Sequence, residues 1–382
     1  MRGQKVKGKI GLLATSSVMM SYMAVSAILS AVSKSFPEAS VTLIQMITTG
    51  SCIVTTIVSV LMQKITPYVS KKRLIIAASV IHVFVGMSIY FFHPTVVSMV
   101  VMSALLGIVS GVCIPCVPGL IHDTYDEKEG GILLGLQGGF ISGGAMLFIW
   151  LGGQLGKNDW KNCYLVYLLT IPIIIIEILT LPEGKLAPKK QKTEKRDKIP
   201  MSVWIFTMTQ VLFNMFIYVY ASNISMLVDF RKIGGTLEAS YASALYNLAG
   251  MAAGCLVGYI IPKLRQQIFS LAVALGIAGM FLCFLSRGFV GICLGSALCG
   301  MSFTIFVPAA NYYASMDSTD YNRMICLAII NTGSSAGHFI SPVFTGALGL
   351  SVVNSFWGAG VGMSALLVIT LISGFCFMRK RQ

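Results

Sequence analysis

The sequence has 382 residues, of which 55% are hydrophobic and 11% are charged, and its mean hydropathy is +0.80. An ordinary soluble domain carries about 25% charged residues, so this composition excludes a soluble globular protein. The formal net charge of +14 raises nucleic-acid binding as a possible function, but the placement of that charge along the chain argues against it.

Twelve predominantly apolar stretches follow one another along the chain, each about as long as the ~20 residues that a membrane-spanning helix needs. We therefore predict an all-α integral membrane protein with twelve transmembrane helices. The predicted spans are residues 10–33, 39–62, 74–92, 95–118, 131–152, 162–181, 201–228, 240–262, 268–286, 288–312, 324–348 and 352–378. The first stretch follows basic residues as a signal peptide would, but it is longer than the roughly 7–15 apolar residues of a signal sequence, so we predict an uncleaved helix.

The positive charge lies almost entirely on alternate loops. Of the 28 Lys and Arg, 22 fall on the side of the N-terminus, and the exceptions are Lys34, Lys157, Lys161, Arg231, Lys232 and Arg287. An excess of Lys and Arg marks the cytoplasmic face of a membrane protein. The pattern predicts that both termini are cytoplasmic and that the basic loops contact anionic lipid headgroups, and nucleic acid is not an expected partner.

A single long polar stretch, residues 182–200, divides six predicted spans from six others. We interpret it as a basic cytoplasmic linker between an N-terminal half, 1–181, and a C-terminal half, 201–382. The halves resemble each other: Gln63-x-x-x-Pro67 after the second span aligns with Gly258-x-x-x-Pro262 after the eighth at an offset of 195 residues. Glycines four residues apart, such as Gly107 and Gly111, favour close helix packing.

With these features the chain resembles the major facilitator superfamily over essentially its whole length. The family's loop signature after the second helix reads roughly G-x-x-x-D-R-x-G-R-R, and this chain keeps only the basic end, Ser70-Lys71-Lys72. The resemblance implies two six-helix halves, a substrate site near the bilayer midplane between them, and transport by alternating access. It also implies a multi-pass protein of a cell or inner membrane, from a bacterium, that works as a monomer.

Ionisable side chains within the predicted spans are few, and each is a functional hypothesis because a charge in the membrane interior is costly. They are His82, Glu177 and His338. His338 falls in the middle third of the eleventh span and could bind substrate or carry a proton, since histidine titrates near neutral pH. It is our proton-coupling candidate, and a core histidine bonded to a carbonyl is the alternative. His82 and Glu177 belong to spans that resemble the family's peripheral helices.

Uncharged polar side chains are the other candidates for a solute site, because an amide without a partner in lipid is costly. Gln210, Asn214 and Tyr218 recur every four residues and therefore share one face of the seventh span. We expect them to line the substrate cavity, with interhelical bonding as the alternative. The full predicted set is Gln210, Asn214, Tyr218, Tyr246, Asn247, Asn331, His338, Gln137 and Gln45.

Opposite charges on neighbouring cytoplasmic loops suggest a gate that closes when the transporter faces outward. Exposed ion pairs contribute only about 0–1 kcal/mol each, so several would have to act together. The residues are Lys71, Lys72, Arg73, Asp123 and Asp126 in the first half, and Lys263, Arg265, Asp317 and Asp320 in the second.

The sequence has no phosphate-binding loop and no HExxH motif, so we expect neither an enzyme nor ATP-driven transport, and no cofactor or metal. The ten cysteines are scattered through the spans and are interpreted as small hydrophobic residues. No Lys or Arg lies well inside a span to neutralise a buried anion. The sequence therefore favours secondary transport of a small neutral, zwitterionic or amphipathic organic solute, with protons as a candidate coupling ion. A non-transporting membrane sensor or assembly partner on the same fold is the alternative.

Overall fold

The computed structural model describes residues 2–186, 199–265, 267–318 and 323–380. All regular structure in these ranges is helical, and every predicted span overlaps a helix or a run of helices. The chain forms two compact units, Met1–Thr193 and Glu194–Gln382. Ten helical segments of the described residues are long and apolar enough to cross a membrane.

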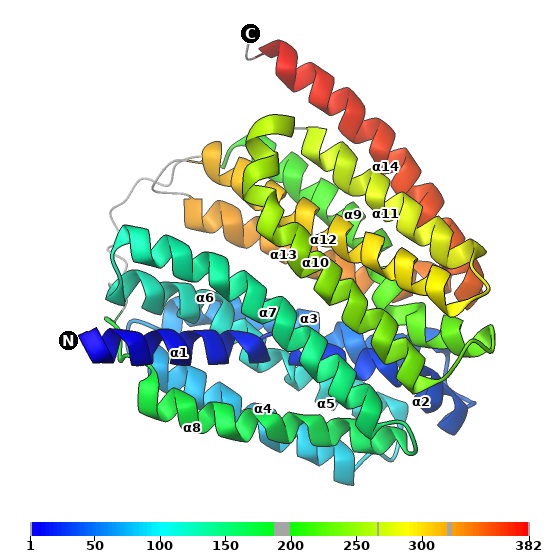
Figure 1. The fold of residues 1–382 in the computed structure, drawn as a ribbon, viewed down its shortest axis with the longest axis horizontal. Helices are drawn as coiled ribbons and strands as arrows, with labels where there is room; N and C mark the ends of the chain where they lie inside the picture. The colour runs from blue at the N-terminus through cyan, green and yellow to red at the C-terminus, as the bar shows by residue number, and fades with distance from the viewer. Residues whose placement is uncertain (1, 187–198, 266, 319–322, 381–382) are drawn as a thin grey trace. The chain divides into compact units, whose positions relative to one another are not determined.

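The first unit contains the helical elements of the first six predicted spans (Figure 1). The α-helices are α1 (Arg2–Val18), α2 (Leu29–Ser35), α3 (Val41–Ile65), α4 (Lys71–Phe91), α5 (Val96–Leu105), α6 (Gly107–Thr124), α7 (Glu127–Leu155) and α8 (Thr170–Thr180), and the 3-10 helices are η1 (Ser21–Ala27) and η2 (Trp160–Leu169). Within this unit α8 runs beside both α1 and α4.

The first span is not the single α-helix that the apolar run predicts. It consists of α1, η1 and α2, with a break at Met19 and Met20. The hydroxyl of Ser110 in α6 donates to the backbone oxygen of Met19, and Ser21 Oγ donates to Val18 O at 2.7 Å. Hydroxyls that bond backbone carbonyls compete with the helical ladder and bend it. Side chains brought in by folding therefore break a run that hydropathy alone shows as continuous.

Two other spans also differ from uniform α-helix. The fourth is divided into α5 and α6 at Leu106, and α6 then continues through Pro115 and Pro118 to Thr124, beyond the predicted end. The sixth begins as the ten-residue 3-10 helix η2 before it becomes α8. Long 3-10 stretches are uncommon, and they often mark a hinge or a sequence under local constraint.

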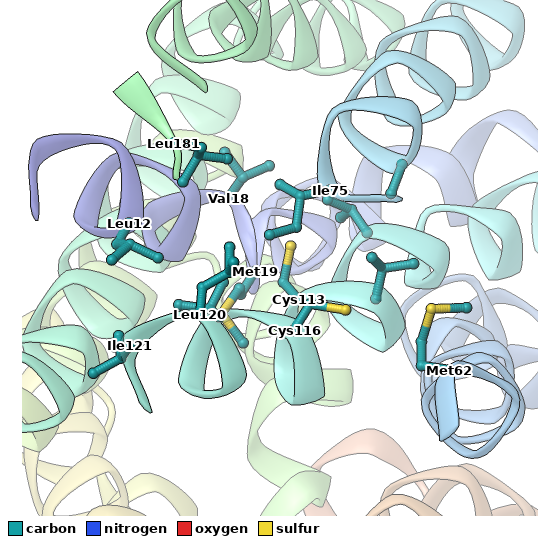
Figure 2. Close-up of a cluster of buried hydrophobic side chains, with 14 of the residues drawn as sticks. Leu12, Val18, Met19, Met62, Ile75, Cys113, Cys116, Leu120, Ile121 and Leu181 are labelled. Carbon is teal, nitrogen blue, oxygen red and sulfur yellow. The ribbon is translucent and has the colours of Figure 1, made fainter. Parts of the chain in front are cut away.

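The core of the first unit lies where α1, α4 and α6 meet (Figure 2). Leu12 and Met19 come from the first span, Ile75 from α4, and Cys113 from α6. Leu181, directly after α8, joins the same cluster. Figure 2 shows these buried side chains gathered from several helices of the first unit.

The second unit contains α9 (Met201–Phe230), α10 (Thr236–Leu264), α11 (Gln267–Leu285), α12 (Phe289–Met316), α13 (Arg323–Ala347) and α14 (Val352–Lys380). Four of these supply candidate spans, and α10 and α13 are long helices that coincide with the eighth and eleventh predicted spans. Both helices carry many small and polar residues.

A close helix contact occurs at corresponding places in the two units. A Cβ at Gly107 of α6 would overlap the backbone oxygen of Ser51 in α3. A Cβ at Gly300 of α12 would overlap the backbone oxygen of Tyr246 in α10 in the same way. Ser51 and Tyr246 are separated by the 195 residues that relate the duplicated loops. Each unit therefore packs its second and fourth spans backbone to backbone, which only glycine permits.

Candidate substrate site

The buried pair Asn214 and His338 joins two helices of the second unit. His338 Nε2 and Asn214 Oδ1 are 2.8 Å apart, and they link α13 to α9. Asn214 has no exposed surface and His338 is 7% exposed. A hydrogen bond therefore joins the predicted polar face of α9 to the histidine predicted in the eleventh span.

The bonding of Asn214 fixes the tautomer of His338. Asn214 Nδ2 donates to the backbone oxygen of Gln210 at 2.8 Å, so its Oδ1 is the atom that faces the imidazole. An amide oxygen only accepts, and Nε2 of His338 must therefore carry the hydrogen in this bond. In the neutral ring Nδ1 then has the lone pair.

Aromatic rings surround His338 on two sides. The ring of Tyr218 lies 4.2 Å from the imidazole, centroid to centroid, at an interplanar angle of 31°. Phe303 of α12 lies 5.9 Å away at 36°, and it is itself 6.5 Å from the ring of Tyr246 in α10. Phe303 and Tyr246 are half-buried. The group therefore presents apolar faces beside one polar edge.

Gln210 extends the polar part of this group by one helical turn. It has no exposed surface, and neither its Oε1 nor its Nε2 has a hydrogen-bond partner among the described residues. A buried amide without partners costs about 1–3 kcal/mol or more for each unsatisfied group. A polar ligand or ordered water that bonds this amide would remove that cost.

Glycines make the contact between α9 and α13 possible. A Cβ at Gly337 would lie 2.8 Å from Cβ of Asn214 and 2.5 Å from the backbone oxygen of Val211. A Cβ at Gly333, one turn earlier, would lie 2.8 Å from Cγ2 of Thr207. The two helix backbones can approach because neither position carries a side chain, and this approach brings His338 within reach of Asn214.

The remaining predicted site residues do not all join this group. Tyr246 stacks on Tyr220 with centroids 4.9 Å apart, and Asn247 Nδ2 bonds Ser243 O of its own helix at 2.9 Å. Asn331 is exposed, and its Oδ1 accepts from Asn311 at 3.4 Å. Gln137 and Gln45 are buried side chains of the first unit, and Gln137 Nε2 lies 3.8 Å from the sulfur of Met19.

Lys71 and Asp123 form a close ion pair between charged loops of the first unit. Lys71 Nζ lies 2.5 Å from Oδ2 of Asp123 and also donates to the backbone oxygen of Lys185 at 2.8 Å. The backbone nitrogen of Lys185 donates to the same Asp123 oxygen at 2.9 Å. This clasp joins the start of α4, the end of α6 and the segment that follows α8, all within one unit.

The other predicted gate residues are not members of that clasp. Asp126 caps α7 by accepting from the backbone nitrogen of Glu129 at 2.9 Å, and Lys72 is 4.0 Å from Glu183. Among the rest, Arg73, Lys263 and Arg265 are exposed, Asp317 is half-buried, and Asp320 is outside the described residues. A gate that joins such loops stays a prediction.

Phe303 is the member of the substrate group that sequence reasoning missed. It lies in an apolar helix of 28 residues that has no charged side chain. In such a helix a phenylalanine is indistinguishable in sequence from an ordinary core residue. Its one distinguishing signal is its place three residues after Gly300, the glycine at which α12 approaches α10 closely.

A model of the Major Facilitator Superfamily matches residues 11–342. The chain belongs to this superfamily. It is therefore a multi-pass membrane protein and a secondary transporter, and the predicted twelve-helix fold and its family resemblance are confirmed. No curated protein gives a significant sequence match.

Solved structures of several transporters have the same fold. The nucleoside transporter NupG superposes with a TM-score of 0.79 at 12% identity, covering 95% of this chain and 99% of its own. A bacterial homologue of the human lysosomal transporter Spinster, in an inward-facing unoccupied conformation, gives 0.74 at 12%, covering 100% and 98%. The POT family transporter PepTSo gives 0.77 at 10%, covering 97% and 98%. At these identities the likeness concerns the fold.

Proposed function

We propose that this protein moves a small neutral, zwitterionic or amphipathic organic solute across a membrane by alternating access, with Asn214, His338 and Gln210 as its polar contacts. The observation that carries the proposal is the buried amide of Gln210, whose two polar atoms have no partner among the described residues, one turn from the Asn214–His338 bond. A solute with its own donor and acceptor supplies the missing bonds.

The charge around this group supports the solute class. Residues 202–228, 239–262, 289–316 and 324–347, which form most of α9, α10, α12 and α13, contain no Asp, Glu, Lys or Arg. A buried phosphate or dicarboxylate needs a countercharge, and these helices supply none. Tyr218 and Phe303 offer flat apolar faces that suit a ring or a hydrocarbon portion.

Ligand-induced thermal stabilisation of the purified protein tests this proposal. The panel contains sugars, amino acids, carboxylates, nucleosides and amphipathic drugs. A ligand at 100 times its dissociation constant adds about 2.7 kcal/mol to the folded state. We expect one uncharged or zwitterionic class to raise the melting temperature, and Asn214→Ala to abolish that rise.

Asn223→Ala is the matched control for the site variant. Asn223 is also fully buried in α9, and its Nδ2 likewise donates to the backbone oxygen four residues earlier, Val219 O, at 3.0 Å. The control should keep the ligand-induced shift. A shift that survives Asn214→Ala and His338→Gln would place the solute elsewhere. Stabilisation by organic phosphates or dicarboxylates would contradict the solute class, and no stabilisation by any class would favour a sensor.

A further inference from the structure

Glu177 is a fully buried carboxyl group in the first unit that the solute site does not use. It lies in α8 between α1 and α4, and its exposed fraction is 0%. Two hydroxyls from the neighbouring helices donate to the same oxygen: Thr15 Oγ1 is 3.0 Å and Ser79 Oγ is 3.1 Å from Glu177 Oε1. Three spans therefore converge on one carboxyl oxygen.

The second oxygen of this carboxyl has no partner. Oε2 is buried and makes no hydrogen bond to any described residue. The Cys113 thiol of α6 interacts electrostatically with Glu177, is uncharged when protonated, and lies in the apolar cluster of Figure 2. Nothing in this contact neutralises a carboxylate.

Three charged or titratable side chains on the helices around Glu177 have other partners. Lys71 of α4 binds Asp123, and Lys9 of α1 pairs with Glu129 at 3.5 Å. His82, one turn from Ser79, has its Nε2 2.9 Å from Ser21 Oγ and its ring against Tyr167 of η2 at 4.9 Å. No described cation is bonded to Glu177.

These contacts match the protonated carboxyl better than the carboxylate. An ionised Glu177 would leave a negative oxygen buried and unpaired, which costs several kcal/mol even after relaxation. In the acid form Oε1 is a carbonyl that accepts from Thr15 and Ser79, and only a neutral O–H remains without an acceptor. That smaller cost is about 1–3 kcal/mol.

The corresponding helices of the second unit show that this packing does not require an acid. There a Cβ at Gly276 would meet Met363, one at Gly362 would meet Phe216, and one at Gly360 would meet Phe281. The hydroxyls of Ser270 in α11 and Thr370 in α14 are 3.4 Å apart, and no acidic side chain of the described residues lies in this interface. The first unit instead places Thr15, Ser79 and Glu177 among its three helices. The acid is thus a property of the first unit and not of the shared architecture.

We propose that Glu177 is a proton-binding site of the first unit, which holds its proton on Oε2 and exchanges it with water when α8 moves relative to α1 and α4. On release the Oε2–H bond breaks, the proton passes to a water molecule, and the carboxylate keeps the hydroxyls of Thr15 and Ser79 on Oε1. The proposal rests on the transporter function, to which it adds a coupling group, and it does not depend on which solute is carried.

The primary experiment is infrared difference spectroscopy of the purified full-length protein during a pH titration. A protonated carboxyl has a carbonyl stretch at a higher frequency than any band of a carboxylate or an amide side chain. We expect a band of this kind that disappears as pH rises, and its loss in Glu177→Gln. The matched control is Glu183→Gln, at a 65%-exposed side chain just beyond the same helix, which should keep the band.

Ser79→Ala provides a second test that does not remove the acid. It takes away one of the two donors to Oε1, so the carbonyl bond strengthens and the same band should move to higher frequency. This variant keeps the assignment testable if Glu177→Gln folds poorly. A band that is unchanged in both variants, or that is absent from the wild-type protein throughout the neutral range, overturns the proposal.

Stability provides a readout with a definite sign. If the folded state holds the Glu177 proton more tightly than the unfolded state, the folded protein binds more protons and its stability falls as pH rises. Glu177→Gln should therefore melt above the wild type at high pH, with the difference shrinking toward acidic pH. A carbonyl band that never titrates, together with parallel melting profiles, means a permanently neutral structural acid and overturns the exchange step. Asn214→Ala, which tests the solute site, should leave the band intact, so the two proposals fail independently.

Discussion

The two units repeat one architecture but place their buried polar groups in different interfaces. In the first unit the acid Glu177 lies where α1, α4 and α8 meet, and it is bonded to hydroxyls. In the second unit the polar pair, Asn214 and His338, joins α9 to α13 beside aromatic rings. The membrane-spanning parts of α9, α11 and α14 have no acid at the place that corresponds to Glu177.

The difference separates what the fold requires from what function adds. Close contact between the second and fourth spans recurs in both units, at Gly107 and at Gly300, so it belongs to the common scaffold. Buried polar groups cost stability wherever they lie. Glu177 of the first unit has no counterpart in the second, and the Asn214–His338 pair of the second has no counterpart in the first. The proposals above give each group a role to test: proton binding for Glu177 in the first unit, and solute binding for Asn214 and His338 in the second.

The largest expected effect tests the shared scaffold. Gly107→Leu and Gly300→Leu each force a side chain into a neighbouring backbone, and overpacking of this kind should cost about 3 kcal/mol or more. Thermal unfolding in detergent should show a large loss for both variants. Gly135→Leu in α7 is the control, because a Cβ there meets no atom within 4 Å. If one unit tolerates the change, the two contacts are not equivalent.

A smaller effect separates two neighbouring acids of the first unit. Asp123→Asn removes the charge from a clasp whose two side chains are only 11% and 15% exposed, and we expect a loss of about 1–3 kcal/mol. Asp126→Asn should change stability by only a few tenths of a kcal/mol, because asparagine caps a helix about as well as aspartate. Chemical denaturation measures both. Equal losses would mean that the clasp contributes no more than a helix cap.

The twelve spans could be predicted from hydropathy, because a helix that crosses a membrane needs a long apolar run. The breaks within those runs could not be predicted in the same way. The break after Val18 involves a backbone oxygen, that of Met19, which is bonded by Ser110 from a helix 91 residues away. Sequence spacing contains no information on such a partner, and only the folded unit brings the two together.

The candidate site was predictable only within one helix. Four-residue spacing places Gln210, Asn214 and Tyr218 on one face of α9, since residues four apart are neighbours on a helix. The bond from Asn214 to His338 spans 124 residues, and it depends on the close approach of α13 at Gly337. The surroundings of Glu177 could not be predicted from the sequence either, because its hydrogen bond to Thr15 joins residues 162 positions apart.

The smallest expected effect concerns the ends of the third span of each unit, which are capped by different chemistry. In the second unit the guanidinium of Arg231 donates to the backbone oxygens of Cys283 and Phe284, in the last turn of α11. In the first unit His93 Nδ1 lies 3.1 Å from the backbone oxygen of Ile89, near the end of α4, with its ring against Trp160. The last carbonyls of a helix have no partner within the helix, so both contacts satisfy otherwise free acceptors.

Arg231→Ala should lower stability by about 1 kcal/mol, because a cation near a helix C-terminus also interacts favourably with the helix dipole. Arg231→Lys keeps the charge but lacks the planar fork that reaches two carbonyls, so it should lose less. His93→Ala is the matched change in the first unit and should lose its cap without any effect on α11. Thermal unfolding at low and high salt distinguishes the two caps: a loss in Arg231→Ala that shrinks with salt reflects the charge. A loss independent of salt would mean that the Arg231 hydrogen bonds act without a contribution from charge. The third spans of both units would then be capped by hydrogen bonding alone.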